Sequence, residues 1–153
     1  LEPDQLPGAG DLVAIDCEFV ALENEKADVR ADGTRVVRRE GRMSLGRVSV
    51  LLGSGAHYDV RCAGNPQYDP GGMPFIDDYV LTPEPVVDYL TRFSGLRQGD
   101  LDAAVTGHHL VPLRTAYLKL RCLVDRGCVF VGHGLKKDFR IVNVLVPPVP
   151  PRL

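Results

Sequence analysis

The sequence has no long apolar run, little net charge and few cysteines. No apolar stretch approaches the roughly 18 residues that a membrane-spanning helix needs, so we expect no membrane partner. The net charge of −2 does not indicate a general polyanion binder, although catalytic carboxylates can offset basic contacts in a nucleic-acid enzyme. The four cysteines form no C-x-x-C pair and have no histidine at a zinc-type spacing. This pattern favours reduced thiols in a cytoplasmic protein.

The residues that are present suit one ordinary domain. The chain has 153 residues, of which 44% are hydrophobic and 25% charged, close to the average for soluble globular proteins. We predict a Pro- and Gly-rich linker at 1–11, a domain at 12–147 and a proline-rich tail at 148–153. The chain starts without methionine or a secretory signal, so we expect it to be a piece of a longer protein.

The apolar pattern predicts strands first and helices later. Strands at 12–20, 44–52 and 74–80 suggest an antiparallel meander, with an exposed strand or hairpin arm at 35–39 and a long loop at 53–72. A short strand at 128–131 follows a helix and should pair parallel with the first strand. Helices are predicted at 83–94, where Val86, Tyr89, Leu90 and Phe93 make an apolar stripe, at 112–126 and at 135–144. The layout indicates an α/β fold with a mixed sheet flanked by helices.

Two acidic residues interrupt the first strand. Asp16 and Glu18 are two residues apart, so their side chains point to the same face. Adjacent carboxylates in a central strand repel each other and lose hydration unless a cation binds between them, and hard oxygen ligands suit Mg²⁺ or Mn²⁺. Asp138, early in the last helix, is a third candidate. The alternatives are an exposed strand end for the pair and complementation of the helix dipole for Asp138.

Other polar residues have weaker signals. Asp77 and Asp78 are adjacent, so they should face opposite sides of a strand. His108 and His109 fall in a predicted exposed loop, and the few tyrosines and phenylalanines mostly sit in apolar stripes, so no base-stacking surface is evident. The arginines between residues 35 and 47 suggest a basic surface. The basic residues around Asp138 are better placed to meet phosphates; they are Lys136, Lys137 and Arg140.

Several segments together resemble one family. Leu-Val-Ala-Ile-Asp-Cys-Glu-Phe-Val at 12–20 resembles the first motif of the DEDD (ribonuclease-T-like) 3′→5′ exonucleases, and Phe-Val-Gly-His-Gly-Leu-Lys-Lys-Asp-Phe at 130–139 resembles the second. Phe-Ile-Asp-Asp-Tyr at 75–79, Val-Val-Asp-Tyr-Leu-Thr at 86–91 and Ala-Tyr-Leu-Lys-Leu-Arg at 116–121 are similar to the catalytic subunits of poly(A)-nuclease deadenylase complexes.

The resemblance implies a ribonuclease-H-like fold and a metal-dependent enzyme that shortens poly(A) tails from the 3′ end and releases 5′-AMP. It implies two divalent ions, Mg²⁺ or Mn²⁺, held by catalytic Asp16, Glu18 and Asp138. Poly(A) RNA and a regulatory deadenylase subunit are the implied partners. The implied substrate contacts are Phe19, Val20, Ser94, Gly95 and Leu96.

The family places a fourth Asp and a general-base His in a third motif, downstream of residue 153. We therefore expect the C-terminal part of the fold to be missing and this fragment to be inactive. Two alternatives stay open at this point. One is an exoribonuclease that acts on other RNAs, and the other is an inactive RNA-binding or scaffold domain of a deadenylase assembly.

Overall fold

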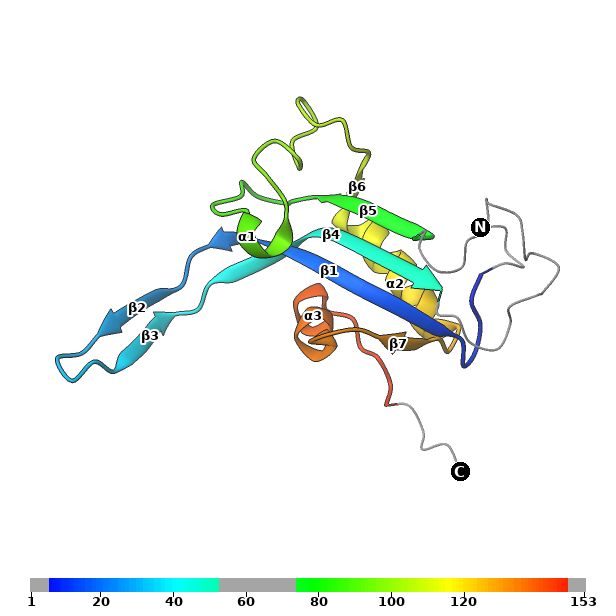
Figure 1. Cartoon of the computed structure of the whole chain (residues 1–153), viewed down its shortest axis with the longest axis horizontal. Helices are drawn as coiled ribbons and strands as arrows, with labels where there is room; N and C mark the ends of the chain where they lie inside the picture. The colour runs from blue at the N-terminus through cyan, green and yellow to red at the C-terminus, as the bar shows by residue number, and fades with distance from the viewer. Residues whose placement is uncertain (1–5, 53–73, 149–153) are drawn as a thin grey trace.

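A computed structural model of the chain describes residues 6–52 and 74–148. Its centre is a five-stranded mixed sheet in the order β6-β5-β4-β1-β7, and a two-stranded arm projects from one end of the sheet (Figure 1). The elements are β1 (Leu12–Glu23), β2 (Lys26–Val29), β3 (Arg35–Arg39), β4 (Arg42–Leu52), β5 (Ile76–Leu81), α1 (Thr91–Ser94), β6 (Leu110–Pro112), α2 (Leu113–Asp125), β7 (Val129–Val131) and α3 (Leu135–Val142).

The strand pairing confirms the predicted α/β architecture. Strands β1, β4 and β5 pair antiparallel as a meander, and β7 pairs parallel with β1. Strand β6 pairs parallel with β5, and β2 pairs with β3 to form the arm; neither β2 nor β6 was predicted as a strand. Both are three or four residues long, too short for the apolar alternation that marks a strand in sequence.

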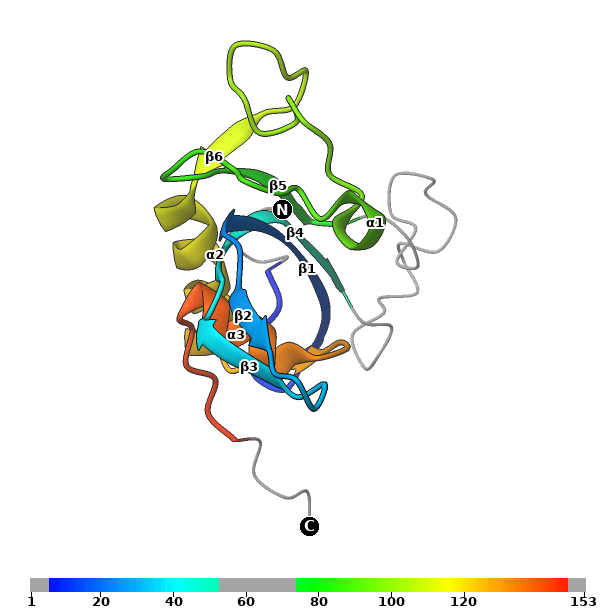
Figure 2. The same ribbon diagram turned by 90° about the vertical axis from the view of Figure 1, so that its left-hand side faces the viewer.

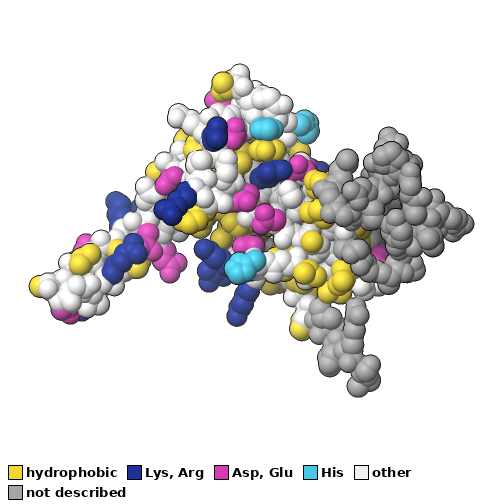
Figure 3. All heavy atoms as spheres, viewed as in Figure 1, with side chains coloured by type: hydrophobic (Ala, Val, Ile, Leu, Met, Phe, Trp, Pro, Cys, Tyr) yellow, Lys and Arg dark blue, Asp and Glu magenta, His cyan; other side chains and the backbone are white. Residues whose placement is uncertain are grey.

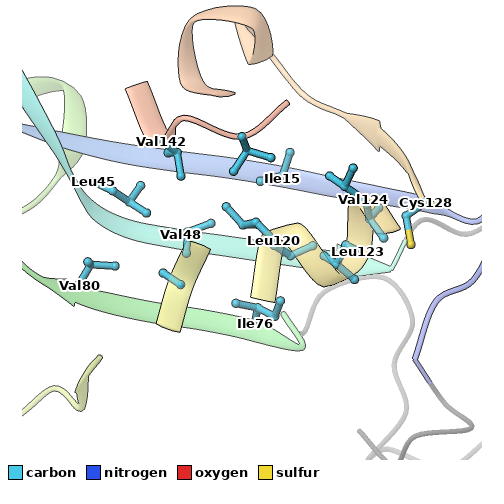
Figure 4. Close-up of a cluster of buried hydrophobic side chains, with 14 of the residues drawn as sticks. Ile15, Leu45, Val48, Ile76, Val80, Leu120, Leu123, Val124, Cys128 and Val142 are labelled. Atoms are coloured by element: carbon cyan, nitrogen blue, oxygen red, sulfur yellow. The ribbon is translucent and has the colours of Figure 1, made fainter. Parts of the chain in front are cut away.

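The main hydrophobic core lies between α2 and one face of the sheet. Helix α2 buries residues spaced by three and four positions, so its apolar side faces the strands. Alternate residues of β1 and β4 point toward that helix, and Val142 of α3 joins them (Figure 4). Burying a leucine or valine side chain stabilises a fold by about 1.5–3 kcal/mol. The largest fully buried side chains in this cluster are Val13, Leu45, Val48, Val50, Val80 and Leu120.

A smaller cluster lies on the opposite face of the sheet. It consists of Val20, Leu96 and Leu101, and α1 lies on this side of the sheet while α2 covers the other (Figure 2). Gly46 makes the close approach possible, because a Cβ at that position would lie 2.6 Å from Leu96 Cδ1. Gly46 has no partner residue on β1 in the pairing of β1 with β4, so it forms a β-bulge at this contact.

The predicted helix at 83–94 is wrong for most of its length. Only Thr91–Ser94 are helical, and the preceding segment is irregular with one isolated bridge to β1. Backbone hydrogen bonds join Ala21 to residues 87 and 88, and the Asp88 carboxylate accepts a hydrogen bond of 2.8 Å from the Leu90 N–H. Pro85 also disfavours helical geometry at the residue before it. Phe93, expected in the apolar stripe, is 81% exposed.

Other predictions differ less. Helix α3 ends at Val142, because Asn143 adopts a left-handed conformation at φ 60°. The predicted loop at 53–72 and Cys62 lie outside the described residues. Cys17, Cys122 and Cys128 are unpaired thiols. Among the described residues, no helix is both long and apolar enough to cross a membrane.

Candidate active site

Asp16 and Glu18 lie on the sheet face opposite the main core. In β1 the side chains of Val13 and Ile15 are buried, whereas Asp16 is exposed and Glu18 half-buried, which confirms the alternation predicted from sequence. Their direct neighbours on β4 are Ser49 and Arg47. Acidic side chains therefore gather near the middle of this face, with basic side chains beside them (Figure 3).

Helix α3 brings Asp138 toward the same part of β1. A Cβ at Gly132 would lie 2.6 Å from the Ile15 carbonyl oxygen, so the chain passes β1 at a distance that only glycine permits. Gly134 then adopts φ 71° and begins α3. The Gly-His-Gly turn predicted from sequence therefore has a geometric role, because it starts the helix directly beside the residue that precedes Asp16. His133, in the middle of the turn, is exposed.

The three carboxylates influence one another. Burial raises the pKa of Glu18, and the charge of Asp16 raises it further, while Arg47 opposes both effects. Burial also raises the pKa of Asp138, again with the charge of Asp16 as the next cause. On the opposite face of β1, the Cys17 thiol has its pKa raised to about 12 by burial and then by these negative charges. The structure thus joins Asp16, Glu18 and Asp138 into one electrostatic cluster.

This cluster is not a closed cage of ligands. Within residues 6–52 and 74–148, no three His, Cys, Asp or Glu side chains are grouped tightly enough to hold one metal ion together. Repulsion between carboxylates opposes closer approach unless a cation lies between them. The site therefore consists of three neighbouring acids, two on a strand and one on a helix, that share an excess of negative charge.

The predicted substrate residues 94–96 lie on the acid side of the sheet. The Ser94 hydroxyl donates to the Tyr89 carbonyl at 2.7 Å and accepts from the Leu96 N–H at 3.0 Å. Leu96 packs on Val20, while Gly95 is exposed at φ 70°. Ser94 and Leu96 thus hold this turn in place, and the exposed backbone at Gly95 is the part open to solvent.

Phe19 is placed differently from the other predicted substrate residues. Its side chain packs against the main core, on the face of the sheet that α2 covers. The structure therefore brings Val20 and the turn at 94–96 together beside the acids, and it directs the Phe19 ring away from them.

A polar network beside the acids was not recognised from sequence. Arg47 donates two hydrogen bonds to Asp77, Nε to Oδ1 at 2.8 Å and an Nη to Oδ2 at 3.0 Å, and Ser49 donates a third to the same carboxylate at 3.0 Å. These bonds hold the pKa of Asp77 below its usual value. The predicted opposite orientation of Asp77 and Asp78 is confirmed, since Asp78 is buried and binds Lys119 on the α2 side.

Two basic residues of α3 line a cleft at the base of the arm. Lys137 and Arg140 line a cleft of about 820 Å³ at the root of the projecting arm, and its other charged lining residues are Arg42 and three glutamates, Glu23, Glu25 and Glu40. In the described part of the chain, neither Lys137 nor Arg140 forms an ion pair, whereas Arg42 is bound by Glu84. Two cations of α3 are therefore open to an anionic ligand near the acids.

Comparison with known proteins identifies close relatives, although no family model matches the chain. The PAN2 catalytic subunit of the PAN2–PAN3 deadenylation complex of Cryptococcus neoformans var. neoformans serotype D is 54% identical over 148 residues, 97% of this chain and 11% of that protein. The human subunit is 46% identical over 144 residues, 94% of this chain and 11% of its own length. The chain is a relative of Pan2. It spans about a tenth of the length of these relatives.

Solved structures of Pan2 share the fold. The pseudoubiquitin hydrolase–RNA exonuclease module of Saccharomyces cerevisiae Pan2, in complex with AACCAA RNA, matches with a TM-score of 0.75 and 39% identity over 96% of this chain and 22% of that chain. The Neurospora crassa Pan2 catalytic unit, with protease and nuclease domains, matches with a TM-score of 0.69 and 35% identity, covering 96% of this chain and 19% of its own. These matches confirm the resemblance inferred from the sequence and the mixed-sheet fold.

Proposed function

We propose that this chain carries part of the active site of a metal-dependent 3′→5′ exoribonuclease that shortens poly(A) tails and releases 5′-AMP. The observation that carries the proposal is that Asp16 and Glu18 share one face of β1 and that the turn at Gly132, which leads to Asp138, lies directly against the same strand. These acids come from the two segments that match the family motifs. The names of the relatives support the proposal, since they describe catalytic subunits of deadenylation complexes. Residues 12–147 form the exonuclease unit in this proposal.

The donor set suits a hard divalent cation. All three candidate ligands are carboxylates, and oxygen ligands favour Mg²⁺ or Mn²⁺ over softer metals. Bound divalent ions would activate the attacking water and stabilise the leaving 3′ oxygen. Asp16 and Glu18 would hold them from β1, and Asp138 from α3. Burial is the main cause of the raised pKa values of Glu18 and Asp138, and binding would relieve the repulsion from Asp16 that raises them further.

The surroundings of the acids suit an RNA strand. Lys137 and Arg140, which lie near Asp138 on α3, would attract phosphates. The exposed backbone at Gly95 would face the 3′-terminal nucleotide, and Val20, which is buried, would support the turn at 94–96 through its contact with Leu96. We further propose that the whole protein assembles with a regulatory subunit of the PAN3 type, because its relatives are named for PAN2–PAN3 complexes.

Degradation of poly(A) by the full-length protein tests this function. Asp16→Asn and Glu18→Gln remove the charges but keep the side-chain sizes, so each should lower the degradation rate at least a hundredfold. Asp28→Asn, which removes an exposed carboxylate from the projecting arm, is the matched control and should leave the rate unchanged. Equal rates in the wild type and both active-site variants would exclude the metal assignment.

One observation favours a second function, an inactive RNA-binding or scaffold domain. Across residues 6–52 and 74–148, no three candidate ligands form a compact group. A protein of this kind would bind poly(A) with the same affinity whether or not Mn²⁺ is present. Under the leading proposal, Mn²⁺ should start degradation of the bound RNA, and a competing mixed-sequence RNA would show whether poly(A) is preferred.

A further inference from the structure

Two rows of side chains cross the sheet on the face that carries the acids. Strand pairing aligns Asp16 with Ser49 and Ser49 with Asp77 in one row. It aligns Glu18 with Arg47 and Arg47 with Tyr79 in the other. Directly paired residues point to the same side of a sheet. The acid face therefore continues from β1 across β4 to β5, and its second row ends in an aromatic ring.

Arg47 and His108 both contact the Tyr79 ring. The Arg47 guanidinium carbon lies 5.0 Å from the centre of the Tyr79 ring, a cation–π contact. Asp77 fixes the guanidinium through its two hydrogen bonds. The His108 ring is stacked on Tyr79, with centroids 3.8 Å apart and planes inclined by only 5°. The two rings therefore form a nearly parallel stack.

The position of His108 is set by its backbone. Its N–H donates to the Thr106 hydroxyl at 3.0 Å, and it lies two residues before Leu110, which pairs with Tyr79 across β5 and β6. His108 is exposed, and the only ring stacked on it among the described residues is that of Tyr79. One face of the histidine ring is thus presented to solvent on the acid side of the sheet.

The distance from this pair to the acids matches the length of a short RNA segment. Adjacent strands are about 4.8 Å apart, so Tyr79 on β5 lies roughly 10 Å from Glu18 on β1. A stacked strand rises about 3.4 Å per nucleotide, so about three nucleotides would cover this distance. Every base has a flat π-face, and purines offer the largest area for stacking on an aromatic ring.

We propose that the Tyr79–His108 pair is a platform on which a purine base of single-stranded RNA stacks, upstream of the 3′-terminal nucleotide. The proposal rests on the proposed exonuclease function and deepens it. His108 contacts the base. Tyr79 stacks on the other face of the histidine ring, and Arg47 and Asp77 are positioning residues that fix Tyr79. A platform of this kind favours runs of adenine because their bases stack on one another and on the protein.

The test combines protein variants with modified substrates. The full-length protein degrades oligo(A) RNAs that each carry one abasic nucleotide, placed at successive positions from the 3′ end. In the wild type, KM should rise about tenfold for one abasic position a few nucleotides from the end, with kcat unchanged. His108→Ala should raise KM about tenfold on unmodified oligo(A). It should show no additional rise at that abasic position, because both changes remove the same contact.

Two further variants separate stacking from folding. His108→Phe keeps a ring and should restore the wild-type KM. His109→Ala removes the neighbouring exposed imidazole and should leave both KM and kcat unchanged. Melting temperatures of all variants show whether the domain is intact.

Two outcomes would overturn the platform: an unchanged KM in His108→Ala, or effects of this variant and the abasic nucleotide that add at every position. If the wild type degrades no RNA, the exonuclease function fails instead, and equilibrium binding of the same oligonucleotides then tests the platform.

Discussion

Replacement of Gly132 by alanine should move Asp138 away from β1 without unfolding the domain. The new Cβ would lie 2.6 Å from the Ile15 carbonyl oxygen and 2.7 Å from Leu135 Cδ2. The leucine side chain can rotate away, but the Ile15 oxygen belongs to a paired strand. Reaching an ordinary contact of 3.4 Å requires the two backbone segments to separate by about 0.8 Å. Because α3 begins three residues later, at Leu135, this shift carries Asp138 with it.

Two magnitudes follow from that displacement. Overpacking of this kind destabilises a protein by about 1–3 kcal/mol, and each kcal/mol lowers the melting temperature of a domain this size by about 2–4 °C. A misplacement of about 1 Å in an active site costs about 10²-fold in rate. We therefore expect Gly132→Ala to remain folded at 25 °C and to degrade poly(A) about a hundredfold more slowly than the wild type.

The assay compares initial rates of poly(A) degradation and melting temperatures for the full-length wild type and variants. Gly107→Ala is the matched control, because a Cβ there meets no atom within 4 Å. It should change neither quantity. Full activity in a Gly132→Ala variant would refute the argument that the close approach of α3 to β1 positions Asp138 for catalysis.

Three further predictions concern stability. Lys119→Met leaves the Asp78 carboxylate, which is 8% exposed, without its partner. The free energy of unfolding in urea should fall by about 2–4 kcal/mol, reduced by the hydration that Asp78 gains through the partly exposed lysine site. An unchanged free energy of unfolding would contradict this. Because the pKa of Asp77 is lowered, its bond to Arg47 stabilises the fold fully at pH values above the ordinary carboxyl pKa of 3.8, and this stability is lost as pH falls through the lowered pKa. Asp77→Asn should therefore weaken the dependence of the unfolding free energy on acid pH. Identical pH profiles of stability in the wild type and Asp77→Asn would refute this prediction. Gly46→Val should push the turn at 96–101 off the sheet and lower the free energy of thermal unfolding by about 1–3 kcal/mol. The displaced turn should also be cut faster by proteases, so an unchanged rate of proteolysis at that turn would count against the prediction.

Strands β1, β4, β5 and β7, the second helix and the acid pair on β1 could be predicted because their signals are local. Asp16 and Glu18 interrupt an apolar run at a spacing of two, which fixes their shared face in any strand. Helix α2 shows its buried face through residues three and four apart. Asp138 gave no such signal from spacing alone, and its link to β1 became visible only through the contact between Gly132 and Ile15.

The features that sequence could not predict depend on contacts between distant segments. The segment before α1 has helical spacing, yet its backbone pairs with Ala21, and this pairing overrides the local pattern. Tyr79 and His108 are far apart in the chain, and only the parallel pairing of β5 and β6 brings their rings together. An exposed loop histidine has no sequence signal that distinguishes a stacked ring from a free one.

Mn²⁺ binding by an Asp138→Asn variant tests the central claim most directly, because Asp138 is the acid that joins the helix to the strand pair. Asparagine keeps the size of the side chain and removes its charge. In calorimetric titrations of the full-length protein, the wild type should bind Mn²⁺ and Asp138→Asn should bind it at least tenfold more weakly, whereas Asp28→Asn should match the wild type. Equal Mn²⁺ affinity in the wild type and Asp138→Asn would contradict a metal site shared by Asp16, Glu18 and Asp138.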